Sequence, residues 1–204
     1  MRNDIKAIAW DFDGVLNRNA VDGRFVWADT LEEDLGIPLA DFETGIFDAT
    51  FNHVISGKID LMDHVQTWLD RSGHKVSASD LVDYWFDKDD LKDPYICGLV
   101  DEIQSLGITQ IIATNNETRR ASYIEDKVGF LCLVSHVFSS GRIGHAKPDK
   151  AFFEHVSKTL GLPPSDILLI DDNASNIRAA QSLGWQGFHF NGQTRFELAS
   201  FLGL

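Results

Sequence analysis

The chain has 204 residues, of which 44% are hydrophobic, and a formal net charge of −13 at pH 7. This length suffices for one full domain and a smaller second one. The negative charge argues against nucleic acid and anionic membranes as partners, because both favour a basic protein face. No run approaches the roughly 18 apolar residues of a membrane helix, and the N-terminal segment lacks the long apolar core of a signal peptide. Only two cysteines occur, both in apolar surroundings, so we expect reduced thiols and a cytoplasmic location.

Residues 5–10 form an apolar run that predicts a buried strand, and Asp11 and Asp13 stand at its end. Open α/β sheets have their active sites at the carboxyl ends of the strands. Alternation along an extended chain would send both carboxylates the same way, and Gly14 permits a sharp change of direction after them. We therefore expect a functional site at this strand end.

The next segment, up to residue 92, shows helical patterns and no run typical of a parallel strand. Apolar residues recur three and four positions apart, with turn signals between the patterns, and predict helices at residues 27–35, 39–51, 61–71 and 78–86. Sixteen acidic residues stand against six Lys and Arg between positions 15 and 90. We therefore expect a small, acidic, all-helical cap at residues 16–92, inserted after the first strand.

From residue 94 onward, strands and helices alternate. Helices are predicted at residues 94–106, 117–128, 148–160, 174–183 and 194–201, and strands at residues 108–113, 134–138, 167–170 and 187–190. This alternation is typical of a parallel sheet with helices on both faces. The predicted fold class is α/β, with a Rossmann-like three-layer α/β/α core formed by residues 1–15 and 93–204, plus the cap.

Three later strand ends also lead to polar residues. Thr114 and Asn115 follow one strand, Lys147 lies beyond a loop after the next, and Asp171 and Asp172 follow a third. Because parallel strands end at the same edge of a sheet, we expect these residues to join the first aspartate pair in one site.

Four aspartates in one site would repel one another unless a divalent cation lay among them, and all-oxygen ligands favour Mg²⁺ over zinc. The cation, Lys147 and the polar groups of Thr114 and Asn115 together suit a phosphoryl group. One carboxylate can attack phosphorus to form an aspartyl-phosphate, while another protonates the leaving oxygen and then activates water. The expected chemistry is therefore phosphoryl transfer.

Four motifs occur along the chain in a fixed order: DFDGV at 11–15, ATNN at 113–116, HAKPD at 145–149 and IDDNASN at 170–176. With a helical insert after the first motif, the whole chain resembles the haloacid dehalogenase superfamily. The similarity is greatest to its subfamily I phosphatases, which depend on magnesium and carry a helical C1 cap. Within that group the chain resembles the branch containing sugar-phosphate phosphatases and the phosphatase-like domains of epoxide hydrolases.

The resemblance implies a role for each matching residue. Asp11 would be the nucleophile. Asp13 would be the general acid and base, and its backbone carbonyl would also bind the metal. Thr114 and Asn115 would bind the phosphoryl group, and Lys147 would pair with that group and with the Asp11 carboxylate.

The resemblance also implies the metal ligands, with Asp172 bound directly. Asn176 stands where some branches of the family carry a second acid, so whether Asp171 or Asn176 completes the metal shell stays open.

Rival functions differ in what they require of the sequence. Dehalogenating family members lack an acid two residues after the nucleophile, because a halide needs no proton to leave, whereas Asp13 is present here. A phosphomutase or phosphotransferase shares all four motifs and stays an alternative. A receiver-like phospho-aspartate signalling module is shorter, lacks a helical insert and carries its acceptor aspartate on a middle strand.

The cap is expected to select the substrate, because the four motifs contact only the phosphoryl group. An acidic cap disfavours polyanions and suits a small phosphorylated metabolite, for instance a sugar phosphate. His53 and Lys58 are candidate specificity residues, with Arg18 and Arg24 as further candidates. We expect the cap aromatics to form chiefly its own core, with a few facing the cleft. A monomer and a homodimer both remain open.

Overall fold

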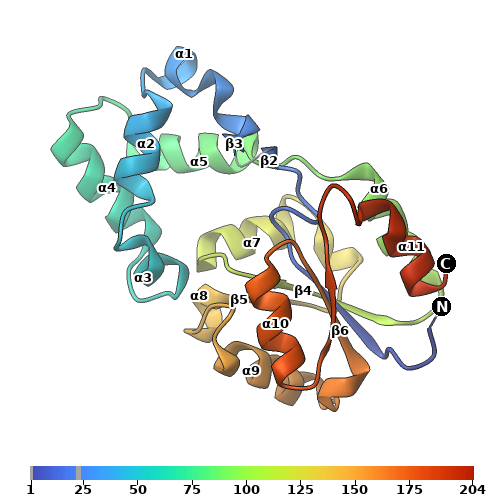
Figure 1. Cartoon of the computed structure of the whole chain (residues 1–204). Coiled ribbons are helices and arrows are strands. Elements are labelled where there is room, and N and C mark those ends of the chain that lie inside the picture. The colour runs from blue at the N-terminus through green and yellow to red at the C-terminus, as the bar shows by residue number, and fades with distance from the viewer. Residues whose placement is uncertain (1, 22–23) are drawn as a thin grey trace.

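The computed structural model describes residues 2–21 and 24–204. Its core is a five-stranded sheet in the order β5-β4-β1-β6-β7, with every neighbouring pair parallel (Figure 1). The strands are β1 (Ala7–Trp10), β4 (Thr109–Thr114), β5 (His136–Ser139), β6 (Ile167–Asp171) and β7 (Gln186–His189). The predicted Rossmann-like parallel sheet is confirmed. The strand order reverses direction between β1 and β6, which is where such sheets open a crevice for ligands.

Helices cover both faces of this sheet, and the side chains of β1 alternate between them. Ile8 and Trp10 belong to one hydrophobic cluster, together with residues of α6, α7 and α11. Ala7 and Ala9 belong to a second cluster, together with residues of α9 and α10. These helices are α6 (Pro94–Ser105), α7 (Thr118–Asp126), α9 (Lys150–Leu160), α10 (Ala174–Ser182) and α11 (Leu198–Leu202).

The inserted segment has a hydrophobic cluster of its own. At its centre, the ring centroid of Phe42 lies 5.3 Å from the ring centroid of Trp27 and 5.3 Å from that of Trp85. The segment consists mainly of η1 (Val26–Thr30), α1 (Leu31–Leu35), α2 (Leu39–Ile46), α3 (Phe51–Ile55), α4 (Leu61–Ser72) and α5 (Ala78–Lys88). Figure 1 shows these helices grouped to one side of the core. The division into a core of residues 1–15 and 93–204 and a cap of residues 16–92 stays our proposal, supported by this separate cluster.

The two segments that connect the core to the cap lie next to each other. The backbone N–H of Arg18 donates to the carbonyl of Leu91 at 2.8 Å, and that of Asp93 donates to the carbonyl of Leu16 at 2.8 Å. Between them, the side-chain oxygen of Asn17 accepts from the Leu91 N–H at 2.8 Å. We call these two hydrogen-bonded segments, residues 16–18 and 91–93, the neck.

The cap departs from the prediction of an all-helical insert. A short antiparallel pair, β2 (Ala20–Val21) and β3 (Arg24–Phe25), precedes its helices. Two residues per strand are too few for an alternating pattern, although the Asp-Gly dipeptide in the sequence at 22–23 is a hairpin signal; those two positions lie outside the described residues.

Other elements were also missed or merged. The predicted helix at 39–51 is two helices, because the Asp48 carboxylate accepts a 2.7 Å hydrogen bond from the Thr50 N–H and starts a new turn. The segment after β5, predicted as a loop, contains α8 (Ser140–Ile143). Short 3-10 helices occur at η2 (Phe130–Cys132), η3 (Pro164–Asp166) and η4 (Arg195–Glu197). None of the helices described is both long and apolar enough to cross a membrane.

Candidate active site

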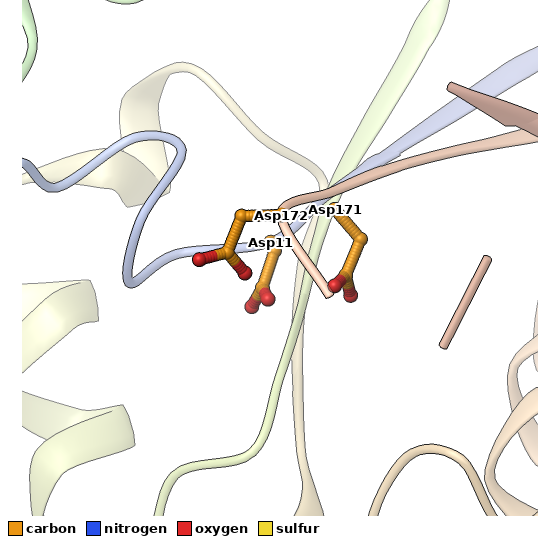
Figure 2. Close-up of side chains that lie close together, drawn as sticks. All are labelled: Asp11, Asp171 and Asp172. Atoms are coloured by element: carbon orange, nitrogen blue, oxygen red, sulfur yellow. The ribbon is translucent and has the colours of Figure 1, made fainter. Parts of the chain in front are cut away.

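Three aspartates meet at the carboxyl ends of the two central strands. Asp11 follows β1, Asp171 is the last residue of β6, and Asp172 comes next. Each contributes one carboxylate oxygen to a group whose members all lie within 4.8 Å of one another. Figure 2 shows the three carboxyl groups gathered where these strands end. The sheet topology therefore brings together residues that are 160 positions apart in the sequence.

Lys147 is the cation of this cluster. Its Nζ lies 3.0 Å from Asp11 Oδ1 and 2.6 Å from Asp171 Oδ2, and its side chain is fully buried. Asn115 holds the lysine backbone from both sides: its Oδ1 accepts from the Lys147 N–H at 2.8 Å, and its Nδ2 donates to the Lys147 carbonyl at 2.7 Å. The Asn115 side chain, predicted to bind the phosphoryl group, is thus engaged in positioning the lysine.

Asp13 points its carboxylate at three asparagines. Its Oδ1 accepts hydrogen bonds from the amides of Asn17 and Asn19 at 3.1 and 2.9 Å, and its Oδ2 accepts one from Asn116 at 2.8 Å. Asn116 also donates to Thr114 Oγ1 at 2.7 Å, which links two of the predicted site residues. Sequence reasoning missed these asparagines as positioning groups, although Asn116 is part of the ATNN motif.

The pKa values of Asp11, Asp172 and Lys147 are all raised from their ordinary values. Burial raises the pKa of Asp11 well above its usual value, and the charges of Asp171 and Asp172 add to this, while Lys147 opposes it. Partial burial and the charge of Asp171 also raise the pKa of Asp172. Burial disfavours the charged form of Lys147, but Asp11 and Asp171 outweigh it and raise the lysine pKa. Negative charge is therefore in excess at this edge of the sheet.

Gly14 allows the two strand ends to approach each other. Its φ is +82°, and a Cβ at this position would lie 2.3 Å from Asp172 Oδ2. Any side chain would both strain the backbone and displace the carboxylate.

The residues present fit a magnesium ion. The cluster supplies carboxylate oxygens, which are the ligands that hard divalent cations prefer. Asn176 donates from Nδ2 to both oxygens of Asp171 at 3.0 and 3.1 Å, while its own Oδ1 is buried without a hydrogen-bond partner among the described residues. This unpaired oxygen, on a side chain that contacts Asp171, could bind a cation directly or accept a hydrogen bond from a water bound to it.

A cavity of about 370 Å³ opens above the cluster, between core and cap. Its floor includes Asp11, Asp13 and Thr114, and its walls include aromatic side chains of the cap, so several of those aromatics face the cleft as well as the cap interior. His53 and Lys58 are both exposed and lie outside the set of described residues that line the cavity. The structure therefore brings the core motif residues together and does not bring these two to them.

Comparison with known proteins agrees with this geometry. A family model described as haloacid dehalogenase-like hydrolase matches residues 5–184. The chain belongs to the haloacid dehalogenase-like hydrolases, as the motif order predicted.

The chain is similar to two curated fungal proteins and to a solved bacterial structure. The sesquiterpene phosphatase astK of Aspergillus oryzae is 26% identical over the full length of both chains. The drimenol cyclase drtB of Aspergillus calidoustus is 37% identical over 73 residues, which span 35% of this chain and 14% of that protein. An enzyme of the same family from Bacteroides thetaiotaomicron, solved with magnesium and inorganic phosphate, has a TM-score of 0.76 at 20% identity, covering 95% of this chain and 98% of its own. The predicted relation to the phosphatase branch is confirmed, and a neighbour of the same fold carries magnesium.

Proposed function

We propose that the protein is a Mg²⁺-dependent phosphomonoesterase that acts on a small phosphorylated metabolite through an aspartyl-phosphate. One observation carries this proposal: the Asp11 carboxylate lies 3.0 Å from the buried Lys147 ammonium and beside two further aspartates, with Asp13 two residues away. The full-length similarity to a phosphatase supports it.

In the first step, a carboxylate oxygen of Asp11 attacks phosphorus in line, and the bond from phosphorus to the ester oxygen breaks. Asp13 gives a proton to that oxygen, so the product leaves as a neutral alcohol. Lys147 and the Thr114 hydroxyl stabilise the charge on the phosphoryl oxygens. Mg²⁺, held by Asp11, Asp172 and the Asp13 carbonyl with support from Asp171 and Asn176, would neutralise further charge there.

In the second step, water attacks the phosphorus of the aspartyl-phosphate. Asp13, now ionised, accepts the proton of that water, the bond between phosphorus and Asp11 breaks, and inorganic phosphate leaves. The asparagines around Asp13 fix the direction of its carboxylate in both steps.

The alternatives predict different products. A 2-haloacid dehalogenase would have no use for an acid at Asp13. A receiver-like signalling module does not fit a chain that belongs to this hydrolase family. A phosphomutase would return the phosphoryl group to a sugar instead of releasing phosphate, so product analysis with a sugar bisphosphate separates it from a phosphatase. A cytoplasmic location and a monomer or homodimer stay predictions.

The direct test is hydrolysis of p-nitrophenyl phosphate near neutral pH. We expect turnover with Mg²⁺, loss of turnover in EDTA, and a loss of at least about 10³-fold in the Asp11→Asn variant. Beryllofluoride should form a stable complex at Asp11 in the presence of Mg²⁺. A folded protein with neither turnover nor such a complex would end the phosphatase proposal.

A further inference from the structure

The cavity above the cluster has an apolar wall made by the cap. Its members come from β3, the turn after α2, α3, α4 and α5, and they are Phe25, Phe47, Phe51, Ile55, Leu61, Trp85 and Phe86. We call these residues the aromatic wall.

The aromatic wall is a continuous surface. The ring of Phe47 lies 4.9 Å from that of Phe51, 5.5 Å from that of Phe25 and 5.6 Å from that of Trp85. The rings hold one another in place, so an apolar group entering the cavity meets a preformed site and loses little free energy in ordering the side chains.

Most polar side chains that line the same cavity already have hydrogen-bond partners; Asp89 Oδ1 and Asn176 Oδ1 have none among the described residues, but both oxygens are buried beneath the cavity surface. Asn19 and Asn116 donate to Asp13. Glu117 accepts from backbone N–H groups of its own helix, and Arg120 donates to the Asp89 carboxylate at 2.8 Å and to the Phe86 carbonyl at 3.0 Å. The hydroxyl groups of a sugar would find few free partners here and would pay the cost of desolvation against aromatic rings.

We propose that the substrate is the phosphate monoester of an apolar alcohol, with its phosphate over Asp11 and its hydrocarbon portion against the aromatic wall. This inference rests on the proposed phosphatase function and names its substrate class. It replaces the sugar phosphate suggested by the acidity of the cap, because Asp89 is the one acidic residue of the described cap that lines the cavity, and the other acidic residues there belong to the core.

The test is a series of n-alkyl phosphates from ethyl to octyl, with glucose 1-phosphate as the polar comparison. Burial of each methylene against the wall should raise kcat/KM by about two- to fourfold until the chain outgrows the cavity. Glucose 1-phosphate should be no better than ethyl phosphate. Values independent of chain length, or a preference for the sugar phosphate, would overturn the inference while leaving phosphatase activity in place. Failure to hydrolyse even p-nitrophenyl phosphate would instead reject the proposed function.

A matched pair of variants tests the wall itself. Phe47→Gln introduces a polar amide into the cavity, whereas Leu39→Gln makes a comparable change at a half-buried cap residue that packs on the same cluster outside the cavity. We expect the ratio of octyl to ethyl phosphate kcat/KM to fall at least about tenfold in the first variant and to stay within twofold in the second. Equal falls in both variants would mean that the cap as a whole has been disturbed and would contradict the inference.

A binding measurement gives a readout that does not depend on turnover. Calorimetric titration with n-octylphosphonate and with ethylphosphonate, in the presence of Mg²⁺, should show a more negative heat-capacity change for the longer chain, because that change reports burial of apolar surface. Equal heat-capacity changes would overturn the inference.

Discussion

The floor and the aromatic wall of the cavity are built by opposite means. The floor consists of charged and amide side chains at the ends of β1, β4 and β6, and the buried Lys147 beneath them binds Asp11, Asp171 and Asn115 through ion pairs and hydrogen bonds. The wall consists of apolar side chains on short cap helices, held by ring contacts that have no required direction. Directional bonds tolerate little substitution, whereas apolar contacts tolerate volume-conserving changes. In the proposed function, the core therefore fixes the reaction, and the choice of substrate is open to change in the cap.

The largest expected effect comes from removing the positive charge of Lys147. Lys147→Met leaves Asp11 and Asp171 buried without their partner, which should cost about 3–5 kcal/mol in the free energy of unfolding and reduce kcat by at least about 10³-fold. Denaturant titration and steady-state kinetics measure the two losses. The exposed Lys150 is the control, since Lys150→Met should change neither; a fully active Lys147→Met variant would contradict the proposed floor.

The next effect separates the acid from the nucleophile. Asp13→Asn preserves the size of the side chain, but it cannot supply a proton and it replaces one acceptor oxygen with an NH2 group that faces the asparagine donors, so kcat with an alkyl phosphate should fall by about 10²–10⁴-fold. The loss should be smaller with p-nitrophenyl phosphate, whose leaving group departs readily as an anion. Equal losses with both substrates would argue against proton transfer by Asp13 to the leaving oxygen.

A smaller effect tests the close approach of the two strand ends. Gly14→Ala places a Cβ where Asp172 Oδ2 now lies, so we expect the Mg²⁺ concentration for half-maximal activity to rise by about tenfold or more. Gly36→Ala is the matched control, because Gly36 also has a positive φ, of +67°, but nothing lies within 4 Å of the added Cβ. Both variants should lose about 1–2 kcal/mol of stability from backbone strain. The shift in metal requirement should occur only in the first.

The smallest expected effect, taken per pH unit, is the pH dependence of stability that comes from Asp89, two residues before the neck. Burial and the charge of Asp13, opposed by Arg120, raise the pKa of Asp89 to about 8. The folded state therefore binds this proton more tightly than the unfolded state, so the contribution of Asp89 to stability is greatest below about pH 4 and declines as the pH rises to about 8. The slope is at most about 1.4 kcal/mol per pH unit. Asp89→Asn should flatten the fall in unfolding free energy between pH 6 and 8; an unchanged slope would contradict the assignment.

Core and cap also differ in how well the sequence predicts them. Three of the four motifs directly follow apolar runs, and parallel pairing of those runs brings Asp11, Thr114 and Asp172 to one sheet edge whatever the details of the helices. Lys147 lies beyond α8, so its position depends on the hydrogen bonds with Asn115. The clamp by Asn115 and the asparagines around Asp13 depend on side-chain rotamers, which no local pattern encodes.

The aromatic wall was harder to predict for a different reason. An aromatic residue at helical spacing serves the cap interior and the cavity equally well, and Phe47 and Trp85 do both. Which rings face the site depends on contacts between distant parts of the chain, such as the hydrogen bond that Arg120 donates to Asp89.

The neck has a consequence for the history of the fold. Residues 16–18 and 91–93 are hydrogen-bonded to each other, so the insert begins and ends at the same place on the core. For the core, the insert is therefore equivalent to one long surface loop. Each doubling of such a loop costs only about 0.6 kcal/mol in closure entropy. Evolution could therefore lengthen, shorten or exchange everything beyond the neck while the sheet and its aspartates stayed as they were, and new substrates could be acquired without reinventing the reaction.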